Sequence, residues 1–302
     1  MPNSNLSVSI IIPSWNSEKQ LKQNLRYVYA AAKEVEAEIV VVDDASSFDK
    51  SQEYLEKQAR LGKIRYYFNK TNQGFSYTVN RGVSLAKGDI VILLNTDVRP
   101  SRAAFKNMLR LFKDQEVFAV TFNSGEAWAG AKWKNGMFHH FKVEPNKNNK
   151  DKLNISLWAS GGQAAFDKKK WQQLGGMDLL YKPFYWEDVD LGYRAWKRGW
   201  KIVWDPQSQV VHDHQKSVIA NNFSRKYITD TAQRNQFLFV WKNIYDSQLI
   251  RSHLFALPRL AIAYPLPFLR ALIKLPQVLS RRQQEKKLTK KTDQEIISLW
   301  QK

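Results

Sequence analysis

The stretch Gly-Asp-Ile-Val-Ile-Leu-Leu-Asn-Thr-Asp, residues 88–97, decides the expected fold. Its apolar run, residues 90–94, is rich in β-branched side chains and has no polar position, which is typical of a strand buried on both faces of a sheet. The polar cluster Asn95-Thr96-Asp97 follows at once. The stretch therefore predicts a buried strand that holds a carboxylate rigidly at its end.

Three more short apolar segments in the first third of the chain are predicted strands: residues 8–12, 39–42 and 64–68. Helical patterns at residues 18–32 and 51–61 lie between them. Because parallel strands need crossovers of about this length, the alternation predicts an α/β fold with a parallel sheet and helices on both faces.

Polar clusters follow three of these strands, at residues 13–16, 43–46 and 95–97. In parallel sheets ligands bind beyond the carboxyl ends of the strands, so we expect the three clusters to converge on one site. At Asp43 and Asp44, one carboxylate can accept hydrogen bonds from a base or ribose while the other approaches a metal or caps a helix. A turn with a helix cap is the alternative interpretation.

Asp97 can supply an oxygen to a hard divalent cation, with a polar turn before Pro100 as the alternative. His212 and His214 alternate after the apolar run 203–211, which predicts that both imidazoles point to one side of a strand. Neutral imidazole binds transition metals well, so the histidines could complete a metal site with Asp97. A structural role for each histidine stays open.

A second acidic cluster is Trp186-Glu187-Asp188-Val189-Asp190-Leu191. Its aromatic and apolar surroundings can raise the pKa of a carboxyl toward that of a useful general base. Asp190 and Arg194 have helical i, i+4 spacing, which predicts a structural pair and leaves Glu187 and Asp188 as the catalytic candidates. An acidic helix N-terminus is the alternative.

Composition limits the class of protein. The 302 residues are 43% hydrophobic, which is enough for a sizeable core. The absence of cysteine excludes disulfides and thiolate metal sites. A net charge of +19 predicts an anionic partner: nucleic acid, a phosphorylated ligand or an acidic lipid surface. The N-terminal residues indicate no signal peptide.

The order of motifs resembles family 2 glycosyltransferases of the GT-A fold, especially their rhamnosyltransferase-like branch. The matching pieces are Val-Ser-Ile-Ile-Ile-Pro-Ser-Trp-Asn from Val8, Val-Val-Asp-Asp-Ala-Ser from Val41, Asn-Gln-Gly-Phe from Asn72, the stretch 88–97, Ser-Gly-Gly-Gln-Ala-Ala-Phe from Ser160, Gly-Gly-Met-Asp from Gly175, Trp-Glu-Asp-Val-Asp-Leu from Trp186 and Val-Val-His-Asp-His from Val210. The resemblance implies a mixed, mostly parallel sheet flanked by helices, with a C-terminal helical extension.

The resemblance also implies roles for individual residues on the donor side. The donor-binding set is Pro13, Trp15, Asp43 or Asp44, Asn72, Arg81, Asn95 and Thr96. Asn95 replaces the first aspartate of the family's Asp-x-Asp motif, so metal dependence stays open. Asp97 and His212, with His214 as the alternative, would hold Mg²⁺ or Mn²⁺ against a departing diphosphate.

The implied reaction is a single in-line displacement with inversion, in which Asp188, paired with Glu187, takes the proton of the acceptor hydroxyl. Gly161 and Gly162 would let the backbone approach the sugar or acceptor. Trp186 would stack on a sugar, with a core position as the alternative. The donor would be dTDP-rhamnose or a UDP-sugar, and the acceptor a glycan or lipid-linked saccharide of cell-surface polysaccharide synthesis.

We expect a catalytic domain over residues 1–220, with a donor half of about 1–100 and an acceptor half of 101–220, and a helical, basic region over 221–302. Residues 125–154 are expected to form loops and short strands, and residues 222–245 a helix.

Residues 254–279 mix apolar patches with Arg259, Arg270 and Lys274, and basic residues follow. This pattern suits a segment that lies on a membrane, which would make the protein a cytoplasmic one bound peripherally to the inner face of the cell membrane. A helical hairpin that packs on the catalytic domain is the alternative.

Two other function classes compete with an enzyme. A nucleic-acid-binding protein fits the basic charge but leaves the acidic clusters unexplained, so no nucleic acid is expected as a partner. A catalytically inactive homologue that binds nucleotide sugars fits the same motifs.

Overall fold

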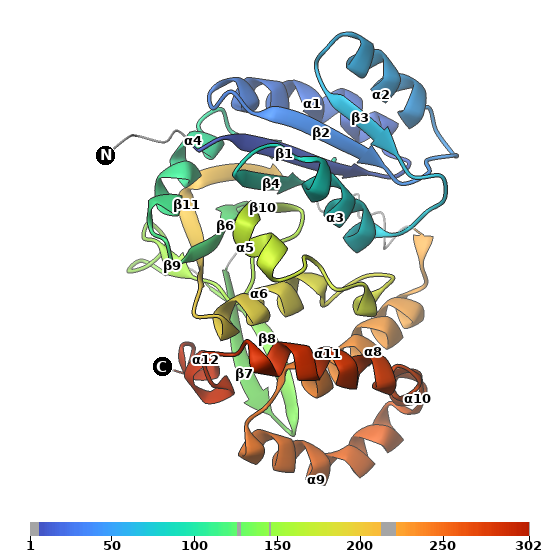
Figure 1. Ribbon diagram of the computed structural model, residues 1–302, viewed down its shortest axis with the longest axis vertical. Coiled ribbons are helices and arrows are strands. Elements are labelled where there is room, and N and C mark those ends of the chain that lie inside the picture. Colours follow the sequence, from blue (N-terminus) through green and yellow to red (C-terminus); the bar gives the residue numbers. More distant parts are fainter. Residues whose placement is uncertain (1–5, 126–127, 145, 213–221, 302) are drawn as a thin grey trace.

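One nine-stranded sheet forms the centre of the computed structural model, which describes residues 6–125, 128–144, 146–212 and 222–301 (Figure 1). The strand order is β3-β2-β1-β4-β10-β6-β11-β5, and β9 pairs with β11. The strands are β1 (Val8–Ser14), β2 (Glu38–Asp43), β3 (Arg65–Phe68), β4 (Ile90–Leu94), β5 (Val98–Pro100), β6 (Val117–Asn123), β9 (Asn154–Ile155), β10 (Gln163–Asp167) and β11 (Lys201–His212).

The four predicted strands of the first third are confirmed as β1 to β4, and their pairings with one another are parallel. The crossover helices are α1 (Glu18–Lys33), α2 (Ser51–Arg60) and α3 (Phe75–Leu85). Successive residues of β1 point to opposite faces: Ile10 packs in the cluster that includes α1 and α2, and Ile11 in the cluster that includes α3. Both faces of the sheet are therefore covered.

The second half of the sheet is mixed. β10 runs antiparallel between β4 and β6, whereas β11 lies parallel to β6 and antiparallel to β5. The helix α4 (Ala104–Leu109) and the 3₁₀ turn η1 (Arg110–Lys113) precede β6, and α5 (Lys168–Gln173) follows β10. The sheet confirms the fold class that the resemblance implies.

The segment expected to be loops and short strands contains a regular β-hairpin, β7 (Trp128–Lys134) paired with β8 (Met137–Val143). Its two-residue turn is Asn135-Gly136, and both residues have positive φ, 55° and 76°. Asn-Gly is the preferred sequence for such a turn because both positions tolerate the left-handed region. The expected short strands are thus present, but the sequence analysis did not identify the Asn-Gly turn that pairs two of them.

Five C-terminal helices follow in the described part of the chain and pack against α6 (Glu187–Lys197) and the β7–β8 hairpin (Figure 1). They are α8 (Arg225–Asn243), α9 (Ser247–Ala263), α10 (Pro265–Ile273), α11 (Leu275–Lys287) and α12 (Asp293–Ser298). The predicted helix at 222–245 is confirmed as α8. Among the described residues no single helix has the length and hydropathy of a membrane span, but α9 and α10 do so together, across a bend of 118°.

A buried charge network joins these helices to α6. Asp190 is fully buried and accepts hydrogen bonds from Arg194 Nε (2.7 Å), Lys242 Nζ (2.8 Å), Asn243 Nδ2 (2.8 Å) and Tyr181 Oη (2.8 Å). The predicted structural pair of Asp190 and Arg194 is confirmed. Burial alone would raise the pKa of Asp190, but the Lys242 ammonium and the Arg194 guanidinium outweigh it and hold this pKa well below its ordinary value.

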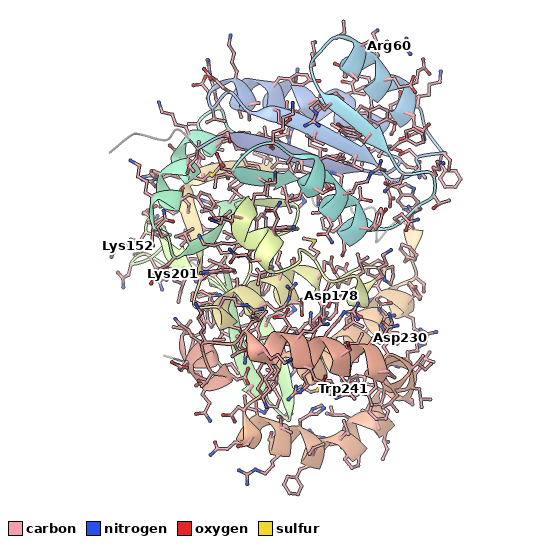
Figure 2. All side chains as sticks on the ribbon, in the orientation of Figure 1. Arg60, Lys152, Asp178, Lys201, Asp230 and Trp241 are labelled. Carbon is pink, nitrogen blue, oxygen red and sulfur yellow. The ribbon has the colours of Figure 1, made fainter. Side chains whose placement is uncertain are left out.

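The network extends to Asp178, labelled in Figure 2, which accepts hydrogen bonds from Lys242 of α8 and Arg281 of α11. The Lys242 ammonium therefore lies between two carboxylates, with 2% of its side chain exposed. One acid alone would not neutralise the cations that surround it, so both are needed.

The Asp190→Asn substitution should lower the free energy of unfolding by about 3 kcal/mol, because it leaves buried cations partly uncompensated. Since the folded pKa of Asp190 is lowered, its contribution is present above the unfolded pKa near 4 and is lost as pH falls through the folded pKa. Urea unfolding at pH 7 and pH 3 measures both effects.

Asp230→Asn is the matched control, because Asp230 pairs with Lys226, whose side chain is 77% exposed. This change should cost less than about 0.5 kcal/mol. Equal losses for the two variants would contradict a structural role for the network.

Candidate functional site

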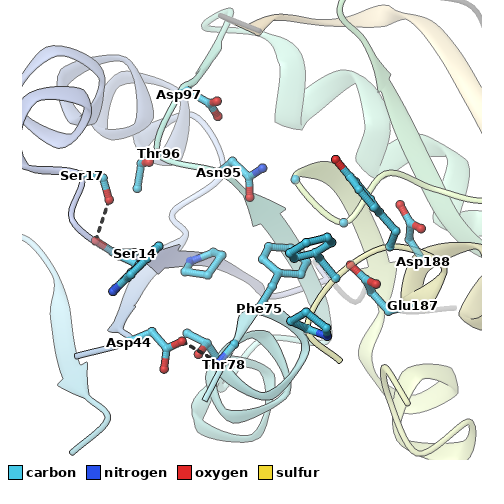
Figure 3. A pocket seen from close by; sticks show the side chains of 18 of the residues that line it. Ser14, Ser17, Asp44, Phe75, Thr78, Asn95, Thr96, Asp97, Glu187 and Asp188 are labelled. Carbon is cyan, nitrogen blue, oxygen red and sulfur yellow. Dashed lines mark hydrogen bonds between the residues drawn. The ribbon is translucent and has the colours of Figure 1, made fainter. Parts of the chain in front are cut away.

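A cavity of about 640 Å³ opens at the carboxyl edge of β1 and β4 (Figure 3). It brings together the three polar clusters that follow the strands, which confirms their expected convergence. The predicted site residues that line it are Pro13, Trp15, Asp44, Asn72, Asn95, Thr96, Asp97, Gly161, Gly162, Glu187, Asp188 and His212. Asp43, Arg81 and Trp186 do not line it, and His214 lies outside the described residues.

The two neighbouring aspartates after β2 have different positions. The Asp43 carboxylate is fully buried and accepts hydrogen bonds from the backbone N–H (2.8 Å) and hydroxyl (2.6 Å) of Ser46. Asp44 lines the cavity, and its oxygens accept hydrogen bonds from Asn69 Nδ2 and the backbone N–H of Gln73 and Gly74. The predicted pair therefore divides: Asp43 shapes the turn, and only Asp44 is placed to meet a ligand.

Arg81 lies behind the cavity wall. Its guanidinium donates hydrogen bonds to the carbonyl of Phe68 (2.6 Å) and to the side-chain oxygen of Asn69. Because Asn69 in turn donates to Asp44, Arg81 fixes the orientation of a cavity residue without reaching the cavity. Its expected direct role near the donor is thus corrected to one of positioning.

Two glycines make room beside Asn95. A Cβ on Gly162 would lie 2.3 Å from Asn95 Nδ2, and a Cβ on Gly161 would lie 2.9 Å from Met177 Cε. The backbone N–H of Asn95 donates to the Gly162 carbonyl at 2.8 Å, so β4 and the turn before β10 are tied together here. The glycines therefore let two chain segments approach at the cavity floor.

Asp97 and His212 form the candidate metal-binding pair. His212 Nε2 lies 3.4 Å from Asp97 Oδ1, an oxygen that is buried and accepts no hydrogen bond. The other ring nitrogen, Nδ1, lies 3.0 Å from Gln163 Oε1, and Gln163 Nε2 donates to Ser124 Oγ. Since an amide oxygen only accepts, the Nδ1–H of His212 donates to Gln163, and this contact turns Nε2 toward Asp97.

This donor set fits a divalent cation that shares its coordination with a ligand. A carboxylate oxygen and an imidazole nitrogen suit Mn²⁺, and Mg²⁺ is often held by one or two protein carboxylates plus phosphate oxygens. Within the described ranges no group of three or more histidine and acidic side chains is close enough to bind a metal without such help.

Glu187 and Asp188 line the opposite side of the cavity, at the start of α6 (Figure 3). The two residues before them, Tyr185 and Trp186, have positive φ of 69° and 77°. Such backbone strain persists only where neighbours enforce it. The enforcing contact is Asn235 of α8, whose side-chain amide donates to the carbonyls of Tyr181, Phe184 and Tyr185.

Burial changes the acidity of this pair. Burial, together with the neighbouring Asp188 charge, raises the pKa of Glu187 to about 8, and Glu187 Oε2 has no hydrogen-bond partner. Burial also raises the pKa of Asp188 to about 6, although backbone N–H groups that favour its charged form oppose this rise. At neutral pH Asp188 is ionised and Glu187 keeps its proton, so one can accept a proton while the other donates a hydrogen bond.

Trp186 belongs to the core rather than to the cavity. Its ring centroid lies 5.1 Å from that of Phe239 and 5.3 Å from that of His140. This is the core position that was the alternative for Trp186, whereas its neighbour Tyr185 lines the cavity with 39% of its surface exposed. The positive φ values turn the chain so that Tyr185, and not Trp186, faces the opening.

Sequence reasoning missed several lining residues. Pro183, Phe184 and Tyr185 form a rim with Phe223, whose ring centroid lies 5.1 Å from that of Phe184. The other missed lining residues are Ser14, Ser17, Gln20, Gly74, Phe75, Thr78 and Ser160. The aromatic run just before the acidic pair was a usable signal, since aromatic side chains beside carboxylates are common where sugars bind. For Gln163, which orients His212, the sequence offered no such signal.

Comparison with known proteins gives a consistent picture. The family model described as glycosyl transferase family 2 matches residues 9–174, more than half of the chain. Human polypeptide N-acetylgalactosaminyltransferase 10 is 26% identical over 234 residues, which cover 70% of this chain and 38% of that protein. The chain thus spans well under half the length of this relative.

Two solved structures share the fold. GalNAc-T7, crystallised with UDP, GalNAc and Mn²⁺, has a TM-score of 0.67 and 18% identity, with 82% of this chain and 49% of that chain covered. Residues 1–349 of TarS from S. aureus, in complex with UDP-GlcNAc, have a TM-score of 0.56 and 15% identity, with 97% and 84% covered. At such identities the likeness concerns the fold.

The double variant Glu187→Gln, Asp188→Asn should be more stable than the natural protein at pH 8, by about 2 kcal/mol. Both carboxyls have raised pKa values in the folded state, so unfolding releases their protons, and folded stability falls as pH rises from about 4 through 6 to 8. Because amides cannot ionise, the double variant does not lose stability in this way. Thermal unfolding at pH 5 and pH 8 measures the difference.

Glu56→Gln serves as the control, since Glu56 is half exposed and pairs with an exposed arginine. This substitution should leave the pH dependence of folded stability unchanged. If the double variant follows the natural protein at both pH values, the two carboxyls are not held in their protonated forms.

Proposed function

Because the chain belongs to glycosyltransferase family 2, we propose that it transfers a sugar from a nucleoside-diphosphate donor to a hydroxyl group of a saccharide acceptor. The observation that carries the proposal is the division of one cavity: a cation-binding pair, Asp97 and His212, on one wall, and a buried acidic pair, Glu187 and Asp188, on the other. A leaving diphosphate and an incoming hydroxyl need these two chemistries.

The nucleotide would bind on the wall formed by Pro13, Trp15, Asp44 and Asn72. Trp15 offers an aromatic surface, Asp44 an acceptor for base or ribose hydrogen bonds, and Asn72 both a donor and an acceptor. Uridine diphosphate is the favoured donor group, because GalNAc-T7 and TarS, two of the solved structures that share the fold, contain it, whereas a third contains GDP-Man. A dTDP-sugar such as dTDP-rhamnose is the second candidate.

Asp97 and His212 would hold a Mg²⁺ or Mn²⁺ ion, with Asn95 and Thr96 beside them. When bound, such an ion supplies the positive charge that stabilises a departing diphosphate. The cavity would depend on this positive charge, since none of the described residues that line it is lysine or arginine. The Gln163 side chain would keep His212 in the tautomer that can bind the ion.

Asp188 would act as the general base. Its carboxylate accepts the proton of the acceptor hydroxyl as that oxygen attacks the anomeric carbon, and the bond to the diphosphate breaks on the opposite face, with inversion. Glu187, which keeps its proton at neutral pH, would donate a hydrogen bond that orients the acceptor. The strained turn held by Asn235 fixes both carboxyls at the start of α6.

The acceptor would enter past the aromatic rim. Tyr185 and Phe223 offer partly exposed rings on the Asp188 side of the cavity, and sugar faces pack well on such rings. Gly161 and Gly162 line the same cavity and would present their backbone to the reacting hydroxyl. A glycan or a lipid-linked saccharide of cell-surface polysaccharide synthesis fits this entrance.

Asp188→Asn should lower the rate of sugar transfer by about 10²- to 10⁴-fold, because the amide cannot accept the proton. Donor binding should be unchanged, since Asp188 lies on the other wall. Release of nucleoside diphosphate measures transfer with UDP-, dTDP- and GDP-sugars, and calorimetry with UDP and Mn²⁺ measures binding. In the natural protein kcat/KM should rise with pH through about 6, the pKa of Asp188.

Glu56→Gln, remote from the cavity, is the activity control. Donor binding without transfer in the natural protein, across all three donor classes and a set of saccharide acceptors, would identify an inactive nucleotide-sugar-binding homologue. Full activity in Asp188→Asn would exclude Asp188 as the base.

Tyr185→Ala should raise the KM for the acceptor by about tenfold, because one partly buried ring contact is worth roughly 1 kcal/mol or more. The affinity for UDP should not change. Tyr27→Ala is the matched control, since Tyr27 has nearly the same exposure, 37%, and does not line the cavity. A parallel loss of UDP affinity in Tyr185→Ala would place this ring in the donor site instead.

A further inference from the structure

The outer sides of α9 and α10 carry a set of large apolar side chains that no other described part of the chain covers. We call them the elbow surface: Leu254, Phe255, Pro258, Ile262, Leu266, Leu269, Leu272 and Ile273. Phe255, Ile262 and Ile273 are 87%, 82% and 79% exposed. In α9 these residues recur every three or four positions, so they share one side of the helix.

The exposed side chains are not the result of a loosely attached helix. On the inner side of α9, His253 Nδ1 donates to the Gly136 carbonyl at 2.7 Å, and His253 Nε2 accepts from Trp241 Nε1 at 2.9 Å. Leu260 of α9 and Ala271 of α10 are buried in the main core. Both helices thus have a firmly packed inner side and an apolar outer side that lacks a partner.

The charge around the elbow surface has one sign. Between Asp246 and Glu285 the sequence has no acidic residue, whereas Arg251, Arg259 and Arg270 lie on the exposed sides of the two helices. Two helices that carry an apolar surface, exposed arginines and no acidic residue are complementary to a layer with an apolar interior and anionic headgroups. A folded protein partner would have to present both an apolar surface and negative charge over the same area.

The bend between the helices determines how they could meet a bilayer. α9 and α10 meet at an angle of 118°, at Tyr264, and each is too short to span the hydrocarbon core alone. Helices that are apolar on one side and packed against protein on the other lie in the plane of the interface. Lying flat would bury the outer side chains and leave the arginines at headgroup level.

We propose that the elbow surface binds this protein to an anionic lipid bilayer, with α9 and α10 lying in the plane of the interface. The lipids of the cytoplasmic leaflet supply such a charge, so the protein would be peripheral on the inner face of the cell membrane. Binding to lipid does not depend on the proposed glycosyl transfer.

The end of α10 and the helix α8 contact the segment that leads to the rim of the cavity. Lys274, at the end of α10, donates to the carbonyl of Leu180 at 3.2 Å, and Arg234 of α8 donates to the carbonyl of Lys182 at 2.5 Å. Lys182 directly precedes the rim residue Pro183. Together with the proposed function, this position would bring an acceptor linked to a membrane lipid to the aromatic rim.

The test is flotation of the full chain with vesicles of phosphatidylcholine alone or with about one-third phosphatidylglycerol. The natural protein should float with the anionic vesicles and at least tenfold less with the neutral ones. Phe255→Gln, Ile262→Gln should weaken anionic-vesicle binding by more than about tenfold, since two apolar side chains are lost from the interface. Because both side chains are almost fully exposed, the variant should keep the natural thermal midpoint.

Phe48→Gln, Leu61→Gln is the matched control, because these apolar side chains are 84% and 58% exposed on the other half of the molecule. It should bind vesicles like the natural protein. Arg259→Glu, Arg270→Glu should reduce binding to the anionic vesicles alone.

Three results would overturn the proposal. They are absence of flotation by the natural protein, an equal loss in the control variant, and loss of self-association in the Phe255 and Ile262 variant without any vesicle binding. The last would assign the surface to a second copy of the chain. Each result is independent of sugar transfer, so failure of the proposed enzyme activity leaves this test intact.

Discussion

The buried carboxylate of Asp190 is the constraint on which the rest of the structure depends. An ionised acid with no exposed surface is tolerated only when cations and donors surround it, and Asp190 obtains them from α6, from α8 and from Tyr181. These partners lie far apart in the sequence, so the carboxylate can be buried only after the C-terminal helices have packed against α6. Since Glu187 and Asp188 begin that helix, the candidate base is placed by the same event.

The C-terminal helices therefore have a second structural role, next to the cavity. Asn235 of α8 holds the strained turn that points Tyr185 toward the opening, while Asp293 of α12 accepts from Tyr193 and pairs with Lys197 at the far end of α6. If α9 and α10 rest on a bilayer, the helix α10 that meets the lipid also packs on α8, and α8 positions the acidic pair. Binding and catalysis would then share one rigid support, which suits an enzyme whose acceptor arrives from the membrane.

The parallel half of the fold could be predicted from sequence because its signals are local. The strand at residues 90–94 and its polar cluster need no partner to be recognised, and the edge where such clusters meet follows from topology. The hairpin at Asn135-Gly136 was equally local and was overlooked. In contrast, the choice between Asp43 and Asp44, or between Tyr185 and Trp186, depends on a single backbone rotation. Contacts such as Asn235 with Tyr185, or Gln163 with His212, join residues about 50 positions apart and leave no sequence pattern.

The distribution of charge resolves an apparent contradiction in the composition. A protein with a net charge of +19 would be expected to bind phosphates through lysine and arginine, yet the described residues that line its cavity include four acids and neither of these cations. Among the described residues the excess positive charge lies outside the cavity lining, where it can act at long range on the anionic donor and the anionic lipids proposed above. Close to the diphosphate, the acids Asp44 and Asp97 would repel it. A divalent ion held by Asp97 and His212, as proposed above, would offset that repulsion, and the buried Asp97 oxygen that accepts no hydrogen bond is available for it.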